Sequence, residues 1–273
     1  MMITTLTLAA IALLPGEDKS YLITDHIVQE TDCVDRYVGA QHLTLCDLSR
    51  AFKRIEDDIR ATVPVGWQGY GTRSGGKVTI PPGRWWLSEP VRFCRQMTVS
   101  GAGGGDWGAP TVLYTPHGSG GFKIAYYYEC QAEGLGEGAQ GTVLERFALL
   151  EATGAKTPTT SPPAYGILVE ARSEIRDVWV RGFVQGVRIS ADHNRNPPTN
   201  ANLWRLHNVV ISATEHDGIF VDGGDANGGV AVAPNATSAC SRGSAWAGTL
   251  GPCACIVMSD FIGSTLIAAH ASG

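Results

Sequence analysis

The 273-residue sequence has little charge and no excess of positive charge. Lysine, arginine, aspartate and glutamate together make up 17% of the residues, and the formal net charge is −5 at pH 7. A nucleic-acid-binding surface needs a basic patch that neutralises phosphates, so no nucleic-acid partner is expected. The low charge also disfavours a coiled coil, and together with 34 glycines it is typical of a protein built from strands and turns.

Long apolar runs are missing as well. The apolar run at residues 6–14 is too short to cross a bilayer, so no membrane span is expected. The run also lacks the preceding basic residues of a secretory signal, because the first charged residues are Glu17, Asp18 and Lys19. A weak signal segment and an ordinary first strand both stay open as interpretations.

Several well-known catalytic and binding motifs do not occur. The sequence has no G-x-S-x-G, no H-E-x-x-H and no cysteine in a recognisable protease context, so Ser-His-Asp hydrolysis is unsupported. The glycine-rich segment 101–108 lacks G-K-[ST], and a strand-like segment follows it in place of a helix. This context excludes a phosphate-binding loop.

The seven cysteines are an odd number, which forbids complete internal pairing. Cys253 and Cys255 form a C-x-C, but no second cysteine pair or histidine pair stands at zinc-finger spacing. The sequence therefore predicts no metal ligands among the cysteines, and we expect buried free thiols.

One amphipathic helix is predicted before a long region of strands. Leu48, Phe52, Ile55 and Ile59 are spaced by four, three and four residues, with Asp47 or Ser49 as the N-cap. Beyond residues 69–76, short apolar runs alternate with glycine, proline, asparagine and aspartate. We therefore divide the chain into a leader (1–46), a capping helix with its linker (47–76) and a β-domain (77–273) that looks incomplete at its C-terminus.

The β-domain contains an internal repeat. Residues 144–149, 175–180 and 206–211 have similar sequences at intervals of 31 residues, and residues 257–262 look like a fourth, looser copy. Each copy has an associated second short strand that opens with a small residue, at 166–169, 186–189, 218–221 and 264–267. Two strands and a return loop per unit predict a β-solenoid, whereas a sandwich has no reason to repeat at a constant interval and a propeller blade has four strands.

The segment 75–103 resembles the opening coils of the pectate-lyase superfamily. The resemblance rests on the preceding helix around residues 51–61, on Pro81-Pro82-Gly83, on Trp86 and on Gly101-Ala102-Gly103. Segments 216–227 and 259–273 are similar to later coils of large bacterial and phage members. The resemblance implies a right-handed parallel β-helix with an N-terminal capping α-helix. Members include polysaccharide lyases, glycoside hydrolases, epimerases, phage tailspikes and proteins without demonstrated activity, so the fold does not decide the function.

Acidic residues and a histidine follow the second strand of several repeats. Stacked coils would align these residues in a column, with about 4.8 Å between residues of neighbouring coils. These candidate catalytic residues are Glu170, Asp192, Asp222, Asp225 and His270. Paired carboxylates serve as general acid and base in glycan hydrolysis. Alternatively they hold Ca²⁺ against a uronate, as in the lyase relatives, and the resemblance then implies Arg188 or Arg195 as the base.

A structural interpretation of the same residues stays open. Asp222-Gly223-Gly224-Asp225 also fits plain turn chemistry. Asp177, Asn208 and Asp260 form a second column, which we interpret as turn or ladder hydrogen-bonding residues inside the solenoid.

Aromatic residues are candidates for sugar stacking. Trp85 and Trp86 alternate if they lie in one strand, so one of the two rings should face outward. We take Trp86 and Trp107 as stacking candidates and add Arg195 and His216 as candidate substrate-binding residues.

The sequence supports two hypotheses about function. The first is a polysaccharide-degrading lyase or glycoside hydrolase that binds its glycan along one face of the β-helix, with Ca²⁺ as a cofactor only if it is a lyase. The second is a non-catalytic β-helical module, such as part of a phage tailspike or surface fibre, that binds glycans or forms a homotrimer. Both hypotheses imply an extracellular or virion-associated protein.

Overall fold

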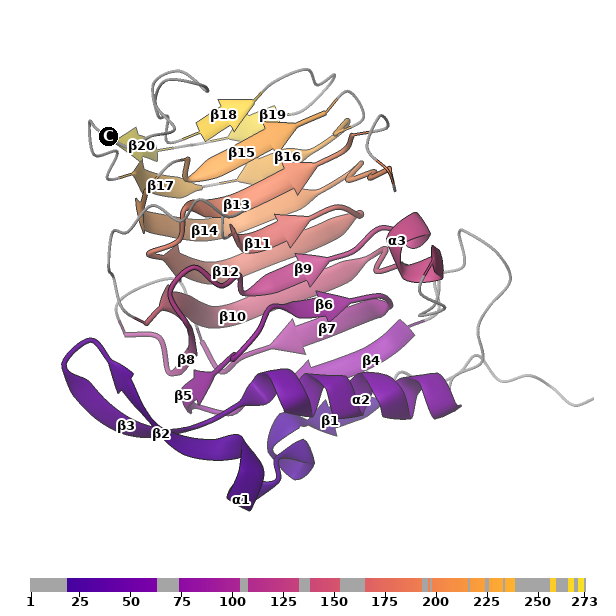
Figure 1. The fold of residues 1–273 in the computed structure, drawn as a ribbon. Coiled ribbons are helices and arrows are strands. Elements are labelled where there is room, and N and C mark those ends of the chain that lie inside the picture. The colour runs from indigo at the N-terminus through magenta and orange to yellow at the C-terminus, as the bar shows by residue number, and fades with distance from the viewer. Residues whose placement is uncertain are drawn as a thin grey trace, which may run out of the picture.

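The computed structural model describes residues 19–62, 74–103, 108–132, 138–152, 165–192, 196, 198–215, 217–223, 226–232, 234–238, 256–258, 265–267 and 270–272. These residues form a parallel β-helix, in which the chain winds upward through stacked rungs (Figure 1). Every strand pair in the coil is parallel, and this confirms the predicted fold class. Each rung covers the apolar side of the one below it, which a single rung cannot bury alone.

Two parallel sheets make the walls of the coil. The six-stranded sheet contains, in order, β6 (Val91–Phe93), β9 (Phe122–Ile124), β11 (Tyr165–Val169), β13 (Gln185–Ser190), β15 (Ile219–Asp222) and β18 (Ile256–Met258). The main path of the twelve-stranded sheet contains β1 (Ser20–Leu22), β4 (Ser74–Thr79), β7 (Gln96–Ser100), β10 (Thr142–Glu151), β12 (Ser173–Arg181), β14 (Arg205–Thr214), β16 (Val230–Val232) and β19 (Thr265–Ile267). Its side branches are β5 (Gly83–Trp86), β8 (Thr111–Thr115), β17 (Asn235–Ser238) and β20 (His270–Ser272).

The three longest strands bend in the middle. Arg146, Asp177 and Asn208 have φ angles of 60°, 53° and 48°, in the left-handed region. Asparagine and aspartate enter this region more readily than most residues, because their short polar side chains bond locally. The Asn208 Nδ2 donates to Asp177 Oδ1 at 2.8 Å, so this part of the predicted ladder is confirmed. It lies on the solvent side of the bend, however, and not inside the solenoid; Asp260 lies outside the described residues.

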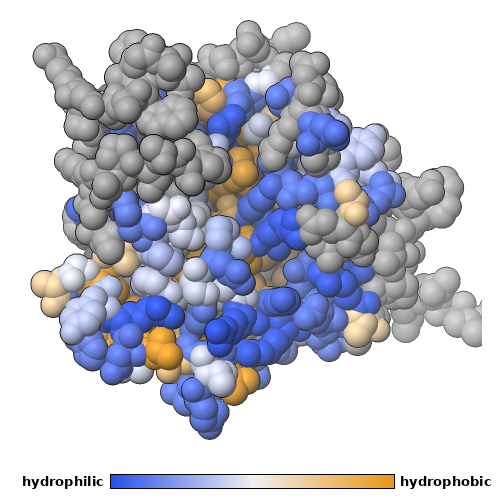
Figure 2. Space-filling model, viewed as in Figure 1, coloured by the Kyte–Doolittle hydropathy of each residue, from blue (hydrophilic) through white to orange (hydrophobic). Residues whose placement is uncertain are grey.

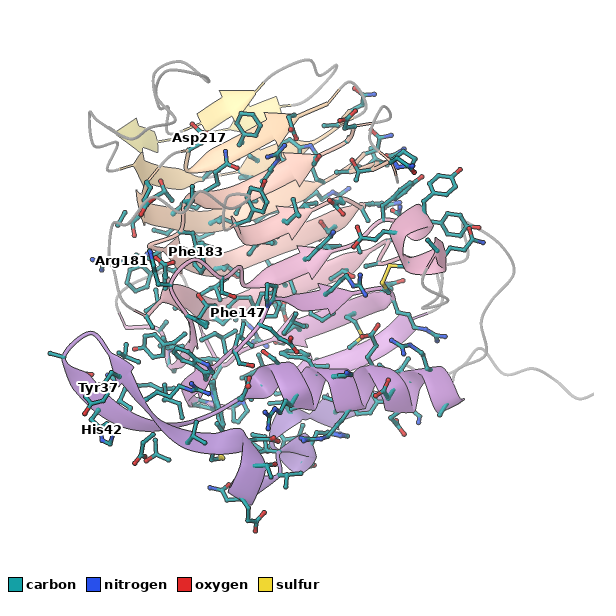
Figure 3. All side chains as sticks on the ribbon, in the orientation of Figure 1. Tyr37, His42, Phe147, Arg181, Phe183 and Asp217 are labelled. Carbon is teal, nitrogen blue, oxygen red and sulfur yellow. A yellow bond between two sulfur atoms is a disulfide. The ribbon has the colours of Figure 1, made fainter. Side chains whose placement is uncertain are left out.

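The 31-residue repeat is confirmed for its three strong copies. Leu144, Ile175 and Leu206 are direct neighbours in successive strands, and all three side chains are buried in the core. Phe147 and Phe183 also lie inside the coil (Figure 3). The predicted second strands are likewise in register, through Ile167, Val187 and Ile219.

The predicted fourth copy is wrong. Val257 lies in β18, which pairs with β15 in the six-stranded sheet, and Leu266 lies in β19, which pairs with β16 in the twelve-stranded sheet. The true neighbour of Leu206 is Ala231 in β16, closer in sequence than the repeat predicts. Return loops of unequal length bring strands into register at unequal sequence intervals, so a constant interval fails here.

The predicted amphipathic helix is α2 (Leu48–Thr62), and it lies across the first rung. Leu48, Phe52, Ile55 and Ile59 are buried in the same core cluster as the coil. Asp47 is the N-cap, because its Oδ1 accepts a hydrogen bond from the Ser49 backbone N–H at 3.0 Å.

Residues 19–46, where the sequence shows little periodicity, contain regular structure. They form β1, which pairs with β4, then η1 (Ile23–His26), α1 (Gln29–Asp32) and the hairpin of β2 (Cys33–Val38) and β3 (Gln41–Cys46). Leu45 on the hairpin packs with Trp86 and Tyr114 on the outer side of β5 and β8. The rings of Tyr37 and His42 are in tilted contact, with 4.9 Å between their centroids, on the other face of the hairpin (Figure 3).

Four of the seven cysteines form disulfides, which corrects the prediction of free thiols. Cys33 and Cys46 are bonded across the hairpin, and Cys94 is bonded to Cys130. Direct pairing of Cys33 with Cys46 in the β2–β3 register brings their side chains together. An odd number of cysteines does not tell which of them the fold brings together. Cys240, Cys253 and Cys255 lie outside the described residues.

In the described part of the chain, no helix has the length and apolar character needed to cross a membrane.

Candidate functional site

A straight row of side chains runs along the outer face of the six-stranded sheet. Its strands have alternating burial, so every second residue points away from the core. The strand registers place five outward positions side by side, and we call them the outer row: Arg92, Lys123, Leu168, Arg188 and Phe220. Successive members are separated by about 4.8 Å, the spacing between strands.

Charged groups gather at the N-terminal end of the outer row, in what we call the Lys–Glu cluster: Arg92, Lys123, Glu129 and Glu170. Lys123 Nζ donates to Glu129 Oε1 and Oε2 at 2.7 and 2.6 Å, and it lies 3.2 Å from Glu170 Oε2. Arg92 donates to Glu129 Oε1 at 3.3 Å. The Glu170 side chain is fully buried, whereas that of Glu129 is 15% exposed. Glu129 is therefore the carboxylate of the pair that a ligand can reach.

The electrostatics of the cluster keep Glu129 ionised. Burial alone would raise its pKa, but Lys123, a hydrogen bond with Glu170 and the Arg92 guanidinium outweigh burial and lower the pKa of Glu129. The cluster thus holds an ionised carboxylate beside a lysine.

A disulfide positions Glu129. Glu129 lies in the short helix α3 (Tyr127–Ala132), next to Cys130, whose partner Cys94 directly follows β6. The bond holds α3 against the end of the six-stranded sheet, so Glu129 faces Lys123 and Arg92. Sequence reasoning missed both Lys123 and Glu129, because the cysteines were taken as free thiols. The spacing of Cys94 and Cys130 around them was the available signal.

A second cluster surrounds Arg188, farther along the outer row. The Arg188 guanidinium donates to the Tyr165 hydroxyl at 2.8 Å and to Asp222 Oδ2. It lies 5.3 Å from the ring centroids of both Tyr165 and Phe220. Asp222 Oδ1 is buried and has no hydrogen-bond partner among the described residues.

Arg188 is held as a cation in this arrangement. Burial acts to lower its pKa, but the Asp222 carboxylate and the Tyr165 hydroxyl outweigh burial and raise the pKa of Arg188. This arrangement suits binding and charge stabilisation, and the base role that the family resemblance implied for Arg188 stays a prediction. Gly223, which follows Asp222, has a φ of 94°, so the turn interpretation of Asp222-Gly223 also holds.

The predicted column of acids does not form one site. Glu170 contacts Lys123, whereas Asp222 contacts Arg188. The half-buried Asp192 lies just beyond β13, where its backbone N–H donates to Thr199 Oγ1 at 2.8 Å. His270 lies in β20, which pairs with β17 in the twelve-stranded sheet, so its predicted place in the column is wrong. Four predicted residues lie outside the described residues: Trp107, Arg195, His216 and Asp225.

Trp86 is not an exposed stacking platform, which corrects that expectation. Its side chain points outward as alternation allows, but the hairpin covers it and leaves it 5% exposed. The Arg36 guanidinium lies 4.7 Å from its ring centroid. Tyr128, on α3 beside the Lys–Glu cluster, is 48% exposed and is the more accessible ring.

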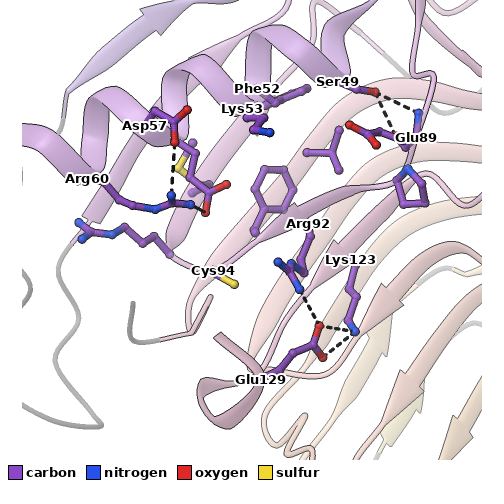
Figure 4. A pocket seen from close by; sticks show the side chains of 16 residues that line it. Ser49, Phe52, Lys53, Asp57, Arg60, Glu89, Arg92, Cys94, Lys123 and Glu129 are labelled. Atoms are coloured by element: carbon purple, nitrogen blue, oxygen red, sulfur yellow. Dashed lines mark hydrogen bonds and ion pairs between the residues drawn. The ribbon is translucent and has the colours of Figure 1, made fainter. Parts of the chain in front are cut away.

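A cavity of about 620 Å³ opens at the N-terminal end of the outer row, between α2 and β6 (Figure 4). Arg92, Lys123 and Glu129 are among its lining residues. In Figure 2, hydrophilic side chains lie along α2 and the adjoining part of this face, with apolar side chains between them in the middle. Across the described ranges, no group of three or more histidine, cysteine, aspartate or glutamate side chains is placed to hold a metal ion.

Comparison with known proteins supports the fold and leaves the activity open. No family model and no curated protein matches the chain. Among solved structures, the mannuronan C-5 epimerase AlgE6 A-module of Azotobacter vinelandii has a TM-score of 0.50 and 16% identity, over 92% of this chain and 56% of that one. The AlgE4 A-module of the same species has a TM-score of 0.47 and 14% identity, over 92% of this chain and 59% of that one. The Agl-KA catalytic domain has a TM-score of 0.45 and 15% identity, over 94% of this chain and 48% of that one.

This chain therefore spans about half to three-fifths of the length of these structures. Its fold is a right-handed parallel β-helix.

Proposed function

We propose that this protein is a polysaccharide-degrading enzyme whose glycan lies along the outer row. The observation that carries the proposal is the alignment of Lys123, Glu129, Arg188 and Tyr165 on one open face of a rigid coil. Charged groups there can bind sugar hydroxyls, and the exposed face of an aromatic ring can support a sugar ring. The similarity to a structure named for mannuronan accords with a polysaccharide ligand.

The Lys–Glu cluster supplies the chemistry. Glu129 is the ionised group and suits the role of the base. Hydrolysis of a glycosidic bond uses one group that donates a proton to the leaving oxygen and one that accepts a proton from water. In a lyase, Lys123 and Arg188 would instead neutralise the uronate carboxylate, with Ca²⁺ as a further candidate for that role.

The test is turnover of a polysaccharide panel, measured by new reducing ends and by absorbance of unsaturated uronates. Reducing ends without unsaturated products identify a hydrolase, and both together identify a lyase. We expect Glu129→Gln to lower turnover by about 100-fold or more, because general acid–base groups contribute about 10²–10⁴ in rate.

Arg205→Gln is the matched control, because Arg205 is an exposed charge on β14 in the other sheet. Thermal unfolding of each variant checks that the fold is kept. Full turnover by a folded Glu129→Gln variant would remove Glu129 from the mechanism.

A second function is a non-catalytic, glycan-binding β-helical module. This function is favoured because two of the predicted catalytic acids are not free to react: Glu170 is buried, and Asp222 is ion-paired with Arg188. In that case the glycan would bind to the outer row without producing new ends. Light scattering tests the homotrimer that a tailspike or fibre would form.

The two disulfides support an extracellular or virion-associated location under either function. Structural disulfides persist in oxidising compartments and are rare in a reducing cytosol.

A further inference from the structure

The cavity at the end of the outer row has three walls. One side is α2, which contributes Phe52 and Lys53; the back is β6, which contributes Val91 and Arg92. The third side contains Glu129 of α3 and Cys94 of the disulfide (Figure 4). Its volume of about 620 Å³ falls within the range of roughly 300–1,000 Å³ that is usual for small-ligand pockets.

Apolar residues and paired charges share the lining. Phe52 and Phe93 contact each other edge to face at 5.8 Å and are almost fully buried, so they form part of the floor. The charged residues are five basic and four acidic. Most of the acidic groups are ion-paired within the cavity: Arg60 with Glu56 at 3.2 Å and Asp57 at 3.3 Å, and Glu129 with Arg92 and Lys123.

This near-balance of charge favours an uncharged ligand with many hydroxyl groups. A charged ligand would need an excess of the opposite charge to offset its loss of hydration, and the ion pairs leave little excess. Hydroxyl groups both donate and accept, so they suit a rim where ammonium or guanidinium groups stand beside carboxylates. The C–H face of a sugar ring would fit against the apolar floor.

The position of the cavity points to the end of a chain. β6 is the terminal strand of the six-stranded sheet, and α2 lies against it across the first rung (Figure 1). A glycan that follows the outer row from Phe220 toward Arg92 therefore meets α2 and cannot continue along the sheet.

We propose that the cavity between α2 and β6 binds the terminal, uncharged sugar unit of the glycan chain. This assignment rests on the proposed function and deepens it, because it makes the protein one that recognises chain ends. Glu129 and Lys123 line the cavity, so the bond next to the bound end unit lies beside the Lys–Glu cluster.

The first test uses the wild-type protein with linear malto-, laminari-, cello- and manno-oligosaccharides. Each is offered with free ends, with its reducing end blocked by reductive amination, and with its non-reducing end blocked by a bulky ether; oligogalacturonates serve as charged probes. Calorimetry should show that blocking one end weakens binding about tenfold or more, a free-energy loss of about 1.4 kcal/mol.

The second test fills the cavity from its helical wall. Lys53→Trp places a large ring in the cavity from an exposed position of α2 and should weaken binding of the free-ended oligosaccharide by about tenfold or more. Ala61→Trp is the control, because Ala61 is exposed on the same helix and does not line the cavity. It should bind as the wild type does.

The outcomes separate the inference from the proposed function. Equal binding of free and blocked chains, or unchanged binding by Lys53→Trp, overturns chain-end recognition while glycan binding by the outer row stands. If oligogalacturonates bind more tightly than neutral chains, the proposal that the cavity binds an uncharged end unit is wrong. If neither the polymers nor the oligosaccharides bind, the proposed function fails and the inference fails with it.

Discussion

Asp32 ties the first helices of the chain together through a buried carboxylate. Its Oδ2 accepts from the Val28 backbone N–H at 2.8 Å, and both of its oxygens accept from the Arg54 guanidinium of α2. The hydrogen bond from Arg54 is the main cause that lowers the pKa of Asp32 from 3.8 to about 2, against the opposing effect of burial. This one residue therefore joins α1 to the helix that crosses the first rung.

The Asp32–Arg54 pair predicts a specific loss of stability in acid. Because the folded-state pKa is depressed, the stabilisation is complete above pH 3.8 and is lost as the pH falls toward and below about 2. The shift corresponds to about 2 kcal/mol at neutral pH. Urea unfolding of wild type and Asp32→Asn should differ by at least about this amount at pH 7, and the difference should shrink between about pH 4 and pH 2.

Asp25→Asn is the matched control for that series. Asp25 is exposed and makes no side-chain hydrogen bond or ion pair within the part of the chain that the structure describes. Its stability difference from wild type should be small at every pH. A difference for Asp32→Asn that did not change with pH would contradict the assignment.

Among the described elements, α3 is held to a strand that is distant in the sequence by a covalent bond. It has six residues, too few to be a stable helix alone, and it is joined to the end of β6 through Cys94 and Cys130. Local periodicity predicted α2 correctly because four apolar residues mark one face of it. No comparable pattern marks α3, because its place follows from a disulfide between residues 36 positions apart.

Removal of this disulfide should destabilise the protein and disturb the Lys–Glu cluster. For Cys94→Ser with Cys130→Ser we expect a loss of about 2–4 kcal/mol in the free energy of unfolding, because the unfolded chain gains conformational freedom. Turnover or glycan affinity should also fall, since Glu129 loses its anchor. Urea unfolding and the polysaccharide assay measure the two effects.

Thiol labelling provides the direct check. When the wild-type protein is unfolded without a reducing agent, iodoacetamide should not label Cys33, Cys46, Cys94 or Cys130. After reduction, all four cysteines should be labelled. Labelling of Cys94 or Cys130 before reduction would show that the bond is absent.

The whole molecule is stabilised by neighbouring rungs that bury one another. Ile175 lies between Leu144 and Leu206, its neighbours in the rungs below and above, and all three are buried. Such rows replace the single central core of a globular domain, so a defect in one rung exposes its neighbours as well. The same stacking keeps the outer row straight and rigid enough to position a long ligand.

Ile175→Ala should therefore destabilise the coil by about 2–5 kcal/mol, the usual range when a large core side chain leaves a cavity. The measurement is urea unfolding followed by circular dichroism. Arg172→Ala, at an exposed position just before the same strand, should change stability by no more than about 0.5 kcal/mol. Equal stability of the two variants would show that the rungs do not depend on one another.

The sequence by itself determined the wound coil, the helix α2 and three of the rungs. Regular spacing of apolar residues and glycine-bounded strands are local signals, and each rung repeats them. Only the tertiary structure decided which residues form the site. A disulfide holds Glu129 near Lys123, Asp222 contacts Arg188 from the neighbouring strand, and a distant hairpin covers Trp86. Unequal return loops also set the register of the later rungs, and no local pattern of residues encodes the register that such loops produce.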